Sequence, residues 1–159
     1  MQGLADRARE LGKILQQRRF SVVTAESCTG GGIARLLTDE PGASSWFERG
    51  FVTYSNLSKE EMLGVPRSLL ETHGAVSEEV VLAMARGALA HSNGDVSISV
   101  SGVAGPDGGT AEKPVGTVWI GWGLGEDVAE APNFLFPGDR DEVRNRSMLA
   151  AMEGLIQRL

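Results

Sequence analysis

The apolar positions of this chain follow a helical period in some stretches and a strand period in others. Over residues 1–19, apolar side chains recur at helical spacing among charged ones, which predicts an amphipathic first helix. The short β-branched run at 20–25 predicts a strand, and helical spacing returns at 32–38. A proline and a glycine at 41–42 are expected to end this helix, because proline cannot continue a helix and glycine tolerates the left-handed conformation.

The next stretch predicts a strand followed by two short helices. Residues 47–55, FERGFVTYS, are expected to form the strand, and Asn56 after them fits a helix cap. A short helix through Met62 would stop at Gly64, and a further short helix precedes Gly74.

A longer helix and a central strand are expected in the middle of the chain. Ser77 is followed by two glutamates, which is a strong helix start, and Asn93 and Gly94 are expected to terminate this helix. Residues 95–105 then alternate apolar residues with small serines. Such an alternation is typical of a central strand against which helices pack closely.

The last third predicts a loop, a hairpin and a final helix. Residues 105–114 are too rich in glycine and proline for regular structure, whereas 115–123 and 128–136 are expected to form two strands of a hairpin. A helix should follow from about 139 to 159. The alternation of helices and strands predicts an α/β fold of one domain over 1–159, a three-layer sandwich with a mostly parallel mixed sheet and a C-terminal antiparallel hairpin.

This fold class indicates where a ligand would bind. In such sheets ligands gather where strands end and helices begin. We therefore expect any site in the loops that follow positions 25, 55, 104 and 136.

Composition and charge narrow the functional classes. The 159 residues hold 15 Lys and Arg against 21 Asp and Glu, a net charge of -6, which disfavours nucleic acid and anionic lipid as partners. An anionic ligand would therefore need a local cationic cluster. One cysteine excludes an intrachain disulfide, and two distant histidines give no metal-ligand spacing. We therefore expect neither a metal nor a cofactor. We also expect a cytoplasmic protein, because no apolar run reaches membrane-spanning length.

The turn VVTAESCTGG at 22–31 is the first candidate site. Ser27 follows the strand and would lie over free backbone N–H groups, so that the amides of Cys28, Thr29 and Gly30 could receive the oxyanion formed when Ser27 attacks a carbonyl. Two other interpretations stay open: Ser27 or Thr29 as a simple N-cap, and a phosphate cradle. A Walker loop is excluded because no GK[ST] follows.

Lysine is the base that the sequence offers to such a serine. To be neutral, Lys59 needs its pKa lowered from about 10.4 to roughly 7 or 8, which costs about 4 kcal/mol. A helix terminus supplies at most about 1 kcal/mol of this, so burial in a dry pocket would have to supply the rest. Tyr54 could relay the proton. The alternatives are an exposed Lys59 paired with Glu60 or Glu61 and a Tyr54 packed at the sheet edge, while Cys28 is a rival nucleophile or a small buried residue.

Two arginines begin the last helix at i and i+4 spacing. The guanidinium groups of Arg140 and Arg144, beside free helix N–H groups, would suit a phosphate. The alternative is a solvated pair bridged to Asp141 or Glu142.

Five segments of the sequence, taken together, resemble the CinA C-terminal domain family. They are AESCTGG, YSNLSKEEMLGV, GAVSEEV, SGVAGPDGGTAEKPVGTV and FPGDRDEVR, and the likeness runs in order from about residue 4 to 156. The resemblance implies hydrolysis of the carboxamide of nicotinamide mononucleotide to nicotinate mononucleotide and ammonia, a step in bacterial pyridine nucleotide recycling. It also implies a serine nucleophile with lysine and tyrosine, which fall on Ser27, Lys59 and Tyr54.

The resemblance further suggests ligand contacts and an assembly. The substrate or oxyanion contacts that we assign are Cys28, Thr29, Gly30, Gly31, Gly105, Thr110, Arg140 and Arg144. Ser101 stands where the family more often has threonine, and we expect the standalone amidase form without the large N-terminal domain of many CinA proteins. A homodimer is expected, with Trp46, Trp119 and Trp122 as interface candidates, although large aromatics more often lie in the core. A nucleotide-binding module without turnover and an amidase for another small amide remain as alternatives.

Overall fold

The computed structural model of the chain describes residues 2–128 and 131–159. The strands are β1 (Val22–Glu26), β2 (Phe47–Val52), β3 (Val96–Gly102), β4 (Thr117–Leu124) and β5 (Asn133–Leu135). The helices are α1 (Gln2–Arg18), α2 (Gly32–Thr38), α3 (Asn56–Leu63), α4 (Arg67–His73), α5 (Glu78–Ala90) and α6 (Arg140–Arg158), with a 3₁₀ turn η1 at Ala43–Ser45. Within the described ranges no helix combines the length and the apolar content that crossing a membrane would require.

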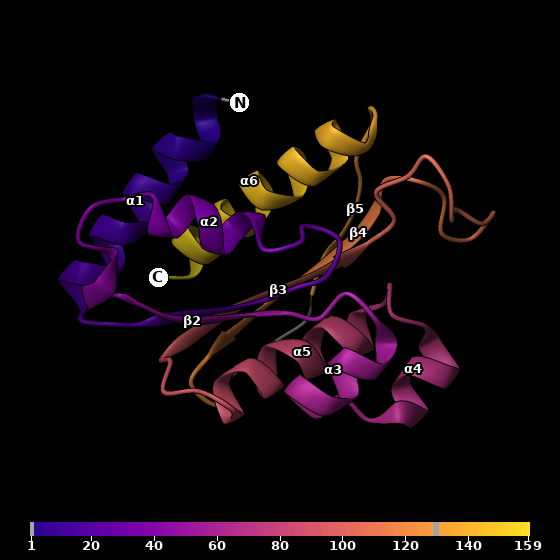
Figure 1. Cartoon of the computed structure of the whole chain (residues 1–159), viewed down its shortest axis with the longest axis horizontal. Helices are drawn as coiled ribbons and strands as arrows, with labels where there is room; N and C mark the ends of the chain where they lie inside the picture. The colour runs from indigo at the N-terminus through magenta and orange to yellow at the C-terminus, as the bar shows by residue number, and fades with distance from the viewer. Residues whose placement is uncertain (1, 129–130) are drawn as a thin grey trace.

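The strands form one mixed sheet in the order β2-β1-β3-β4-β5. β1 is parallel to both β2 and β3, whereas β4 is antiparallel to β3 and β5 is antiparallel to β4, so β4 alone runs against the others. Helices α1, α2 and α6 cover one face and α3, α4 and α5 the other (Figure 1). The expected α/β fold, with its central β3 and its terminal hairpin, is confirmed.

The face under α1 and α6 holds the larger part of the core. Leu11 and Leu15 of α1 are fully buried, as the amphipathic pattern predicted. Trp46 and Trp122 are also buried, and the indole of Trp122 donates to Ala151 O of α6 at 2.9 Å. The prediction that these two tryptophans serve an interface is therefore wrong, because their rings fill the space between sheet and helices within one chain.

On the opposite face, α5 lies close to β3 because the strand presents serines there. Ser97 and Ser99 donate to the carbonyl oxygens of Ala85 and Val81 at 2.9 and 2.6 Å. The alternation of apolar and small residues in β3 thus provides both the buried face and the close helix contact that it predicted. Gly87 of α5 has the same effect on α3, because a Cβ there would collide with the backbone of α3.

Three element boundaries differ from the expectation. Ser55, rather than Asn56, caps α3, since the extended backbone of Ser55 lets its Oγ accept from Ser58 N at 3.1 Å. β2 ends at Val52, which leaves Tyr54 beyond the sheet. The second hairpin strand, expected at 128–136, is limited to β5, and the part of it at 129–130 lies outside the described residues.

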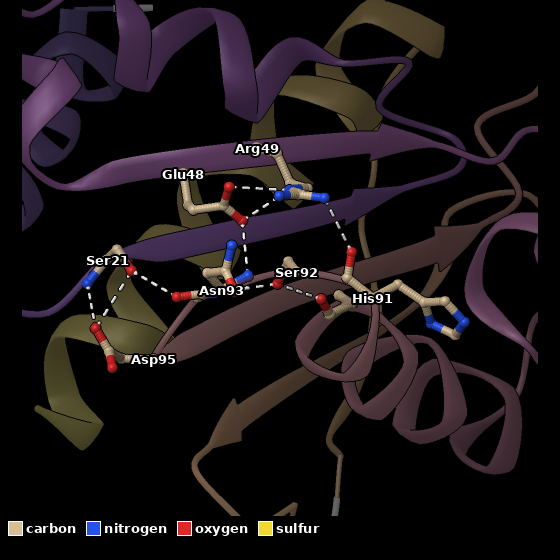
Figure 2. A network of polar contacts seen from close by, with 9 residues as sticks. Ser21, Glu48, Arg49, His91, Ser92, Asn93 and Asp95 are labelled. Carbon is tan, nitrogen blue, oxygen red and sulfur yellow. Dashed lines mark hydrogen bonds and ion pairs between the residues drawn. The ribbon is translucent and has the colours of Figure 1, made fainter.

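The amino ends of the strands are held by a polar network (Figure 2). Ser21 before β1 donates to Asp95 before β3 through its backbone N–H at 2.8 Å. Glu48 of β2 accepts from Asn93 N at 3.0 Å, and Arg49 donates to the carbonyl oxygen of His91 at 3.1 Å (Figure 2). These contacts fix the start of β1, β2 and β3, and the carboxyl ends of the same strands are left to the loops that hold the candidate site.

Candidate active site

The chain leaves the carboxyl ends of β1 and β2 toward opposite faces of the sheet. β1 continues into α2 on one face, and β2 continues into α3 on the other (Figure 1). Open α/β sheets bind their ligands at the carboxyl ends of adjacent parallel strands that diverge in this way. Ser27 is the first residue after β1, and Lys59 lies one turn into α3.

Ser27 and Lys59 meet at this edge of the sheet. The backbone N–H of Ser27 donates to Val100 O of β3 at 3.0 Å, which extends the parallel ladder and fixes the start of the turn. Lys59 Nζ then donates to Ser27 Oγ at 3.0 Å. Only 8% of Ser27 and 1% of Lys59 are exposed, so the contact is nearly closed to solvent.

Burial is the main influence on the charge state of Lys59, which has no carboxylate partner among residues 2–128 and 131–159. Its other acceptors are the backbone oxygens of Thr53 and Tyr54, at 2.8 and 3.4 Å. Desolvation by burial lowers the pKa of Lys59 from its ordinary value of 10.5 to about 8. The alternative of an exposed lysine paired with Glu60 or Glu61 is wrong, because Lys59 is buried and Glu60 pairs instead with Arg67 at 2.9 Å.

Cys28 does not compete with Ser27 as a nucleophile. Its side chain is buried in the hydrophobic core under α2 and α6. Burial raises the pKa of the thiol to about 12, so the reactive thiolate is scarcely populated at neutral pH. The interpretation of Cys28 as a small buried residue is the one that agrees with this environment.

The turn after β1 departs from the expectation of a free helix N-terminus. The carboxylate of Glu26 accepts from Ile33 N at 2.9 Å and from Ala34 N at 3.0 Å. The Gly30 N–H is also engaged, since it donates to Ser27 O at 3.0 Å. Among the described residues, the backbone N–H groups of Cys28 and Thr29 donate to no protein acceptor. The predicted oxyanion donors therefore reduce to the latter two amides.

The N-cap interpretation of Ser27 and Thr29 is wrong as well. The residue before α2 is Gly31, which makes no side-chain cap, and its φ of 92° is one that glycine adopts readily. The hydroxyl of Thr29 donates instead to Glu26 Oε1 at 2.6 Å. Sequence reasoning missed Glu26, although an acidic residue closing an apolar strand before a glycine turn was a signal that could have been followed.

Tyr54 lies beyond the end of β2 and is exposed to solvent rather than packed at the sheet edge. It is 62% exposed, and its hydroxyl accepts from Arg140 Nη2 at 3.2 Å. Arg140 Nη1 donates in turn to Gly105 O at 2.7 Å. The loops predicted to hold the site are thus linked to one another, since Tyr54 also provides a backbone acceptor to Lys59.

Arg144 binds the turn that carries the nucleophile. Its Nε donates to Cys28 O at 3.1 Å and its Nη2 to Thr29 O at 3.2 Å. In the part of the chain that the structure describes, neither Arg140 nor Arg144 forms an ion pair with a carboxylate, so the alternative of a bridge to Asp141 or Glu142 is wrong. Two cations that have no counter-ion among the described residues and lie beside the nucleophile turn and Tyr54 favour an anionic ligand.

Only part of the glycine loop after β3 contacts the other candidate residues. Gly105 has a positive φ of 84° and places its carbonyl oxygen against Arg140. Thr110 is exposed and bonds to Lys113 within its own loop, so the structure does not bring it to the other candidate residues. A further residue that sequence reasoning did not select is Thr53, whose Oγ1 is buried without a partner among the described residues.

The comparisons of this chain with known proteins agree with one another. The family model of the CinA C-terminal domain matches residues 4–159. Nicotinamide-nucleotide amidohydrolase PncC of Pseudomonas putida is 54% identical over 150 residues, which cover 94% of this chain and 93% of that protein. The protein of the same name from Escherichia coli K12 is 50% identical over 148 residues, covering 93% and 90%.

A solved structure agrees with this similarity. The crystal structure of competence/damage inducible protein CihA from Agrobacterium tumefaciens superposes with a TM-score of 0.94 at 41% identity, and the match covers 98% of this chain and 94% of that one. Its α/β architecture is therefore shared over almost the whole length. Sequence and fold together place the chain in the CinA C-terminal domain family.

Proposed function

We propose that this chain hydrolyses the carboxamide of nicotinamide mononucleotide, with Ser27 as nucleophile and Lys59 as base. The observation that carries the proposal is the 3.0 Å contact between Lys59 Nζ and Ser27 Oγ in a closed site. With a pKa of about 8, roughly a tenth of the Lys59 side chains are neutral at pH 7. The names of the relatives from P. putida and E. coli support the substrate.

The reaction follows from this contact. Ser27 Oγ attacks the amide carbon while its proton passes to Lys59 Nζ, and the carbonyl oxygen becomes an oxyanion. The free amides of Cys28 and Thr29 are the donors proposed to receive that oxyanion. Lys59 then returns the proton to the leaving nitrogen, which departs as ammonia. Water attacks the acyl-enzyme, again with Lys59 as base, and releases nicotinate mononucleotide and free Ser27.

We assign the phosphate of the nucleotide to Arg140 and Arg144. Arg140 and Arg144 point guanidinium groups to backbone oxygens and keep further N–H donors for a ligand. The net charge of -6 would otherwise repel a phosphate, so a local cationic pair is what recognition requires. Tyr54, whose hydroxyl accepts from Arg140, is proposed to assist proton transfer, and Gly105, whose carbonyl oxygen also accepts from Arg140, is proposed as a neighbouring ligand contact.

The test is incubation of the protein with nicotinamide mononucleotide, with ammonia and nicotinate mononucleotide quantified by chromatography. Ser27→Ala and Lys59→Met should each lower kcat at least about a thousandfold. Ser44→Ala and Lys13→Met are matched controls, because both side chains are exposed and lie outside the site. Wild-type turnover by Ser27→Ala would refute the mechanism, and tight nucleotide binding without any product would indicate a binding module.

A further inference from the structure

We infer that Glu26 is a positioning residue that holds the nucleophile turn in the geometry that the oxyanion requires. The inference rests on the proposed function, because it assigns Glu26 a task in the same reaction. Glu26 does not touch the reacting atoms. Its carboxylate acts on the turn that follows Ser27 and on the first turn of α2.

The contacts of Glu26 join three parts of the turn. Its Oε1 accepts from Thr29 Oγ1 at 2.6 Å and from Ile33 N at 2.9 Å, and its Oε2 accepts from Ala34 N at 3.0 Å. The residue is only 1% exposed. A buried carboxylate is costly unless it is fully hydrogen-bonded, and these three donors satisfy it. The chain thus keeps a buried anion immediately before the proposed nucleophile.

The turn is held from its other side by a cation. Arg144 donates to the carbonyl oxygens of Cys28 and Thr29, while Glu26 holds the Thr29 hydroxyl. The peptide units from Ser27 to Thr29 are therefore fixed through their carbonyl oxygens and one side chain. This arrangement leaves the N–H groups of Cys28 and Thr29 without a protein acceptor in the described part of the chain. The turn amides are restrained but unoccupied, as preorganised oxyanion donors must be.

Glu26 is also linked to the base through the backbone. Its carbonyl oxygen accepts from Thr53 N at 2.8 Å, and the carbonyl oxygen of Thr53 accepts from Lys59 Nζ at 2.8 Å. The nucleophile turn thus begins directly after Glu26, the last residue of β1. The base is bonded to Thr53, the residue that follows β2 and pairs with Glu26. A substitution of the Glu26 side chain removes its bonds to Thr29 and to α2 and leaves this backbone link in place.

A simple helix cap is the competing explanation, and the Thr29 contact separates the two. A cap needs only the bonds to the amides of α2, whereas positioning also needs the bond that reaches back into the turn. Glu26→Gln keeps the shape but turns one acceptor into an N–H donor that faces another donor. Thr29→Val removes only the bond to the turn and leaves the carboxylate on α2.

The experiment compares these variants in steady-state hydrolysis of nicotinamide mononucleotide. We expect kcat to fall about a hundredfold in Glu26→Gln and about tenfold in Thr29→Val, with KM within about threefold of wild type. Thr29→Ser, which keeps the hydroxyl, should recover at least half of the wild-type kcat. Glu48→Gln is the matched control, because it removes a partly buried carboxylate at the opposite end of the sheet.

A second readout isolates the oxyanion. We would use an analogue in which an aldehyde replaces the carboxamide. Ser27 Oγ adds to the aldehyde carbon, and the resulting oxygen takes the position of the oxyanion. In calorimetry, Glu26→Gln should weaken the binding of this analogue about a hundredfold. It should weaken the binding of the product nicotinate mononucleotide less than threefold, and each ligand should bind at one site per chain. Equal weakening of both ligands, or wild-type affinity for the analogue, would overturn the inference.

Hydrogen exchange provides a readout that needs no substrate. Faster exchange of the Ile33 and Ala34 amides in Glu26→Gln, with the rest of the chain unchanged, is expected from the lost acceptor. If wild type fails to hydrolyse the nucleotide, the proposed function fails by itself. If wild type is active and Glu26→Gln and Thr29→Val match its kcat, the inference fails while the proposed function stands.

Discussion

Replacing Lys59 by methionine should make the protein more stable at neutral pH while removing its activity. The pKa of Lys59 lies at about 8 instead of 10.5, and each unit of difference corresponds to about 1.4 kcal/mol. Holding the ammonium form in the site therefore costs about 3 kcal/mol. Methionine has similar length and no charge, but it leaves the carbonyl oxygen of Thr53 without its donor, a loss of about 1 to 2 kcal/mol. The desolvation cost is the larger, so a net gain of about 1 to 2 kcal/mol is expected.

The pH dependence gives the cleaner measurement. Below about pH 8 the Lys59 amine is protonated in both states and the folded state bears the full cost. Between pH 8 and 10.5 the unfolded chain binds a proton that the folded chain has lost, so the free energy of unfolding rises with pH. From about pH 6.5 to about pH 10 the wild type should gain about 2 to 3 kcal/mol relative to Lys59→Met.

Urea denaturation at the two pH values tests this directly. Lys13→Met, at an exposed position of α1, should keep the wild-type pH dependence. Parallel stability curves for wild type and Lys59→Met would show that the amine is not desolvated in the folded protein. The proposed base would then be fully protonated at neutral pH, and the reasoning behind the mechanism would fail.

Three further outcomes are expected. The kcat/KM for nicotinamide mononucleotide should rise about tenfold per pH unit below about pH 8 and level off above it, because the lowered pKa makes Lys59 neutral there; a flat profile between about pH 6 and 8 would contradict a neutral lysine base. Gly87→Ala should lower the free energy of unfolding by about 1 to 3 kcal/mol in chemical denaturation, since its Cβ collides with the backbone of α3, whereas Gly3→Ala, which meets no neighbour, should not. Iodoacetamide should leave Cys28 unmodified in the folded protein at about pH 8 and alkylate it in urea, as intact mass would show, because burial raises the pKa of this thiol to about 12.

Local rules predicted most of the fold because the relevant interactions lie close in sequence. Gly64 was expected to end a helix, and its φ of 67° is the left-handed conformation that such a stop uses. Ser77 was expected to begin one, and its hydroxyl accepts from Val80 N. Errors remained at Asn56, where the neighbouring Ser55 was an equally good cap, and in the strand expected at 128–136, of which only Asn133–Leu135 is a strand among the described residues.

The types of the candidate residues could also be predicted from the sequence, but their environments could not. Ser27, Lys59 and Arg144 could be selected because few residues of each kind stand at strand ends or helix starts. The acidic residue at the end of the first strand was a local signal, but it did not state that its carboxylate would accept from the helix amides that had been assigned to the ligand. A carboxylate and a helix terminus become partners only when the turn between them closes, and the sequence does not state how it closes.

By itself, then, the sequence determined the alternation of helix and strand, the stops at glycine, and the presence of a serine and a lysine after the first two strands. The tertiary structure decided that Lys59 is 1% exposed and bonded to Ser27, and that Arg144 reaches a turn 115 residues away. The physical reason is that periodicity and capping depend on neighbours within a few residues. Desolvation, and the pKa that follows from it, depends on every element packed around a side chain.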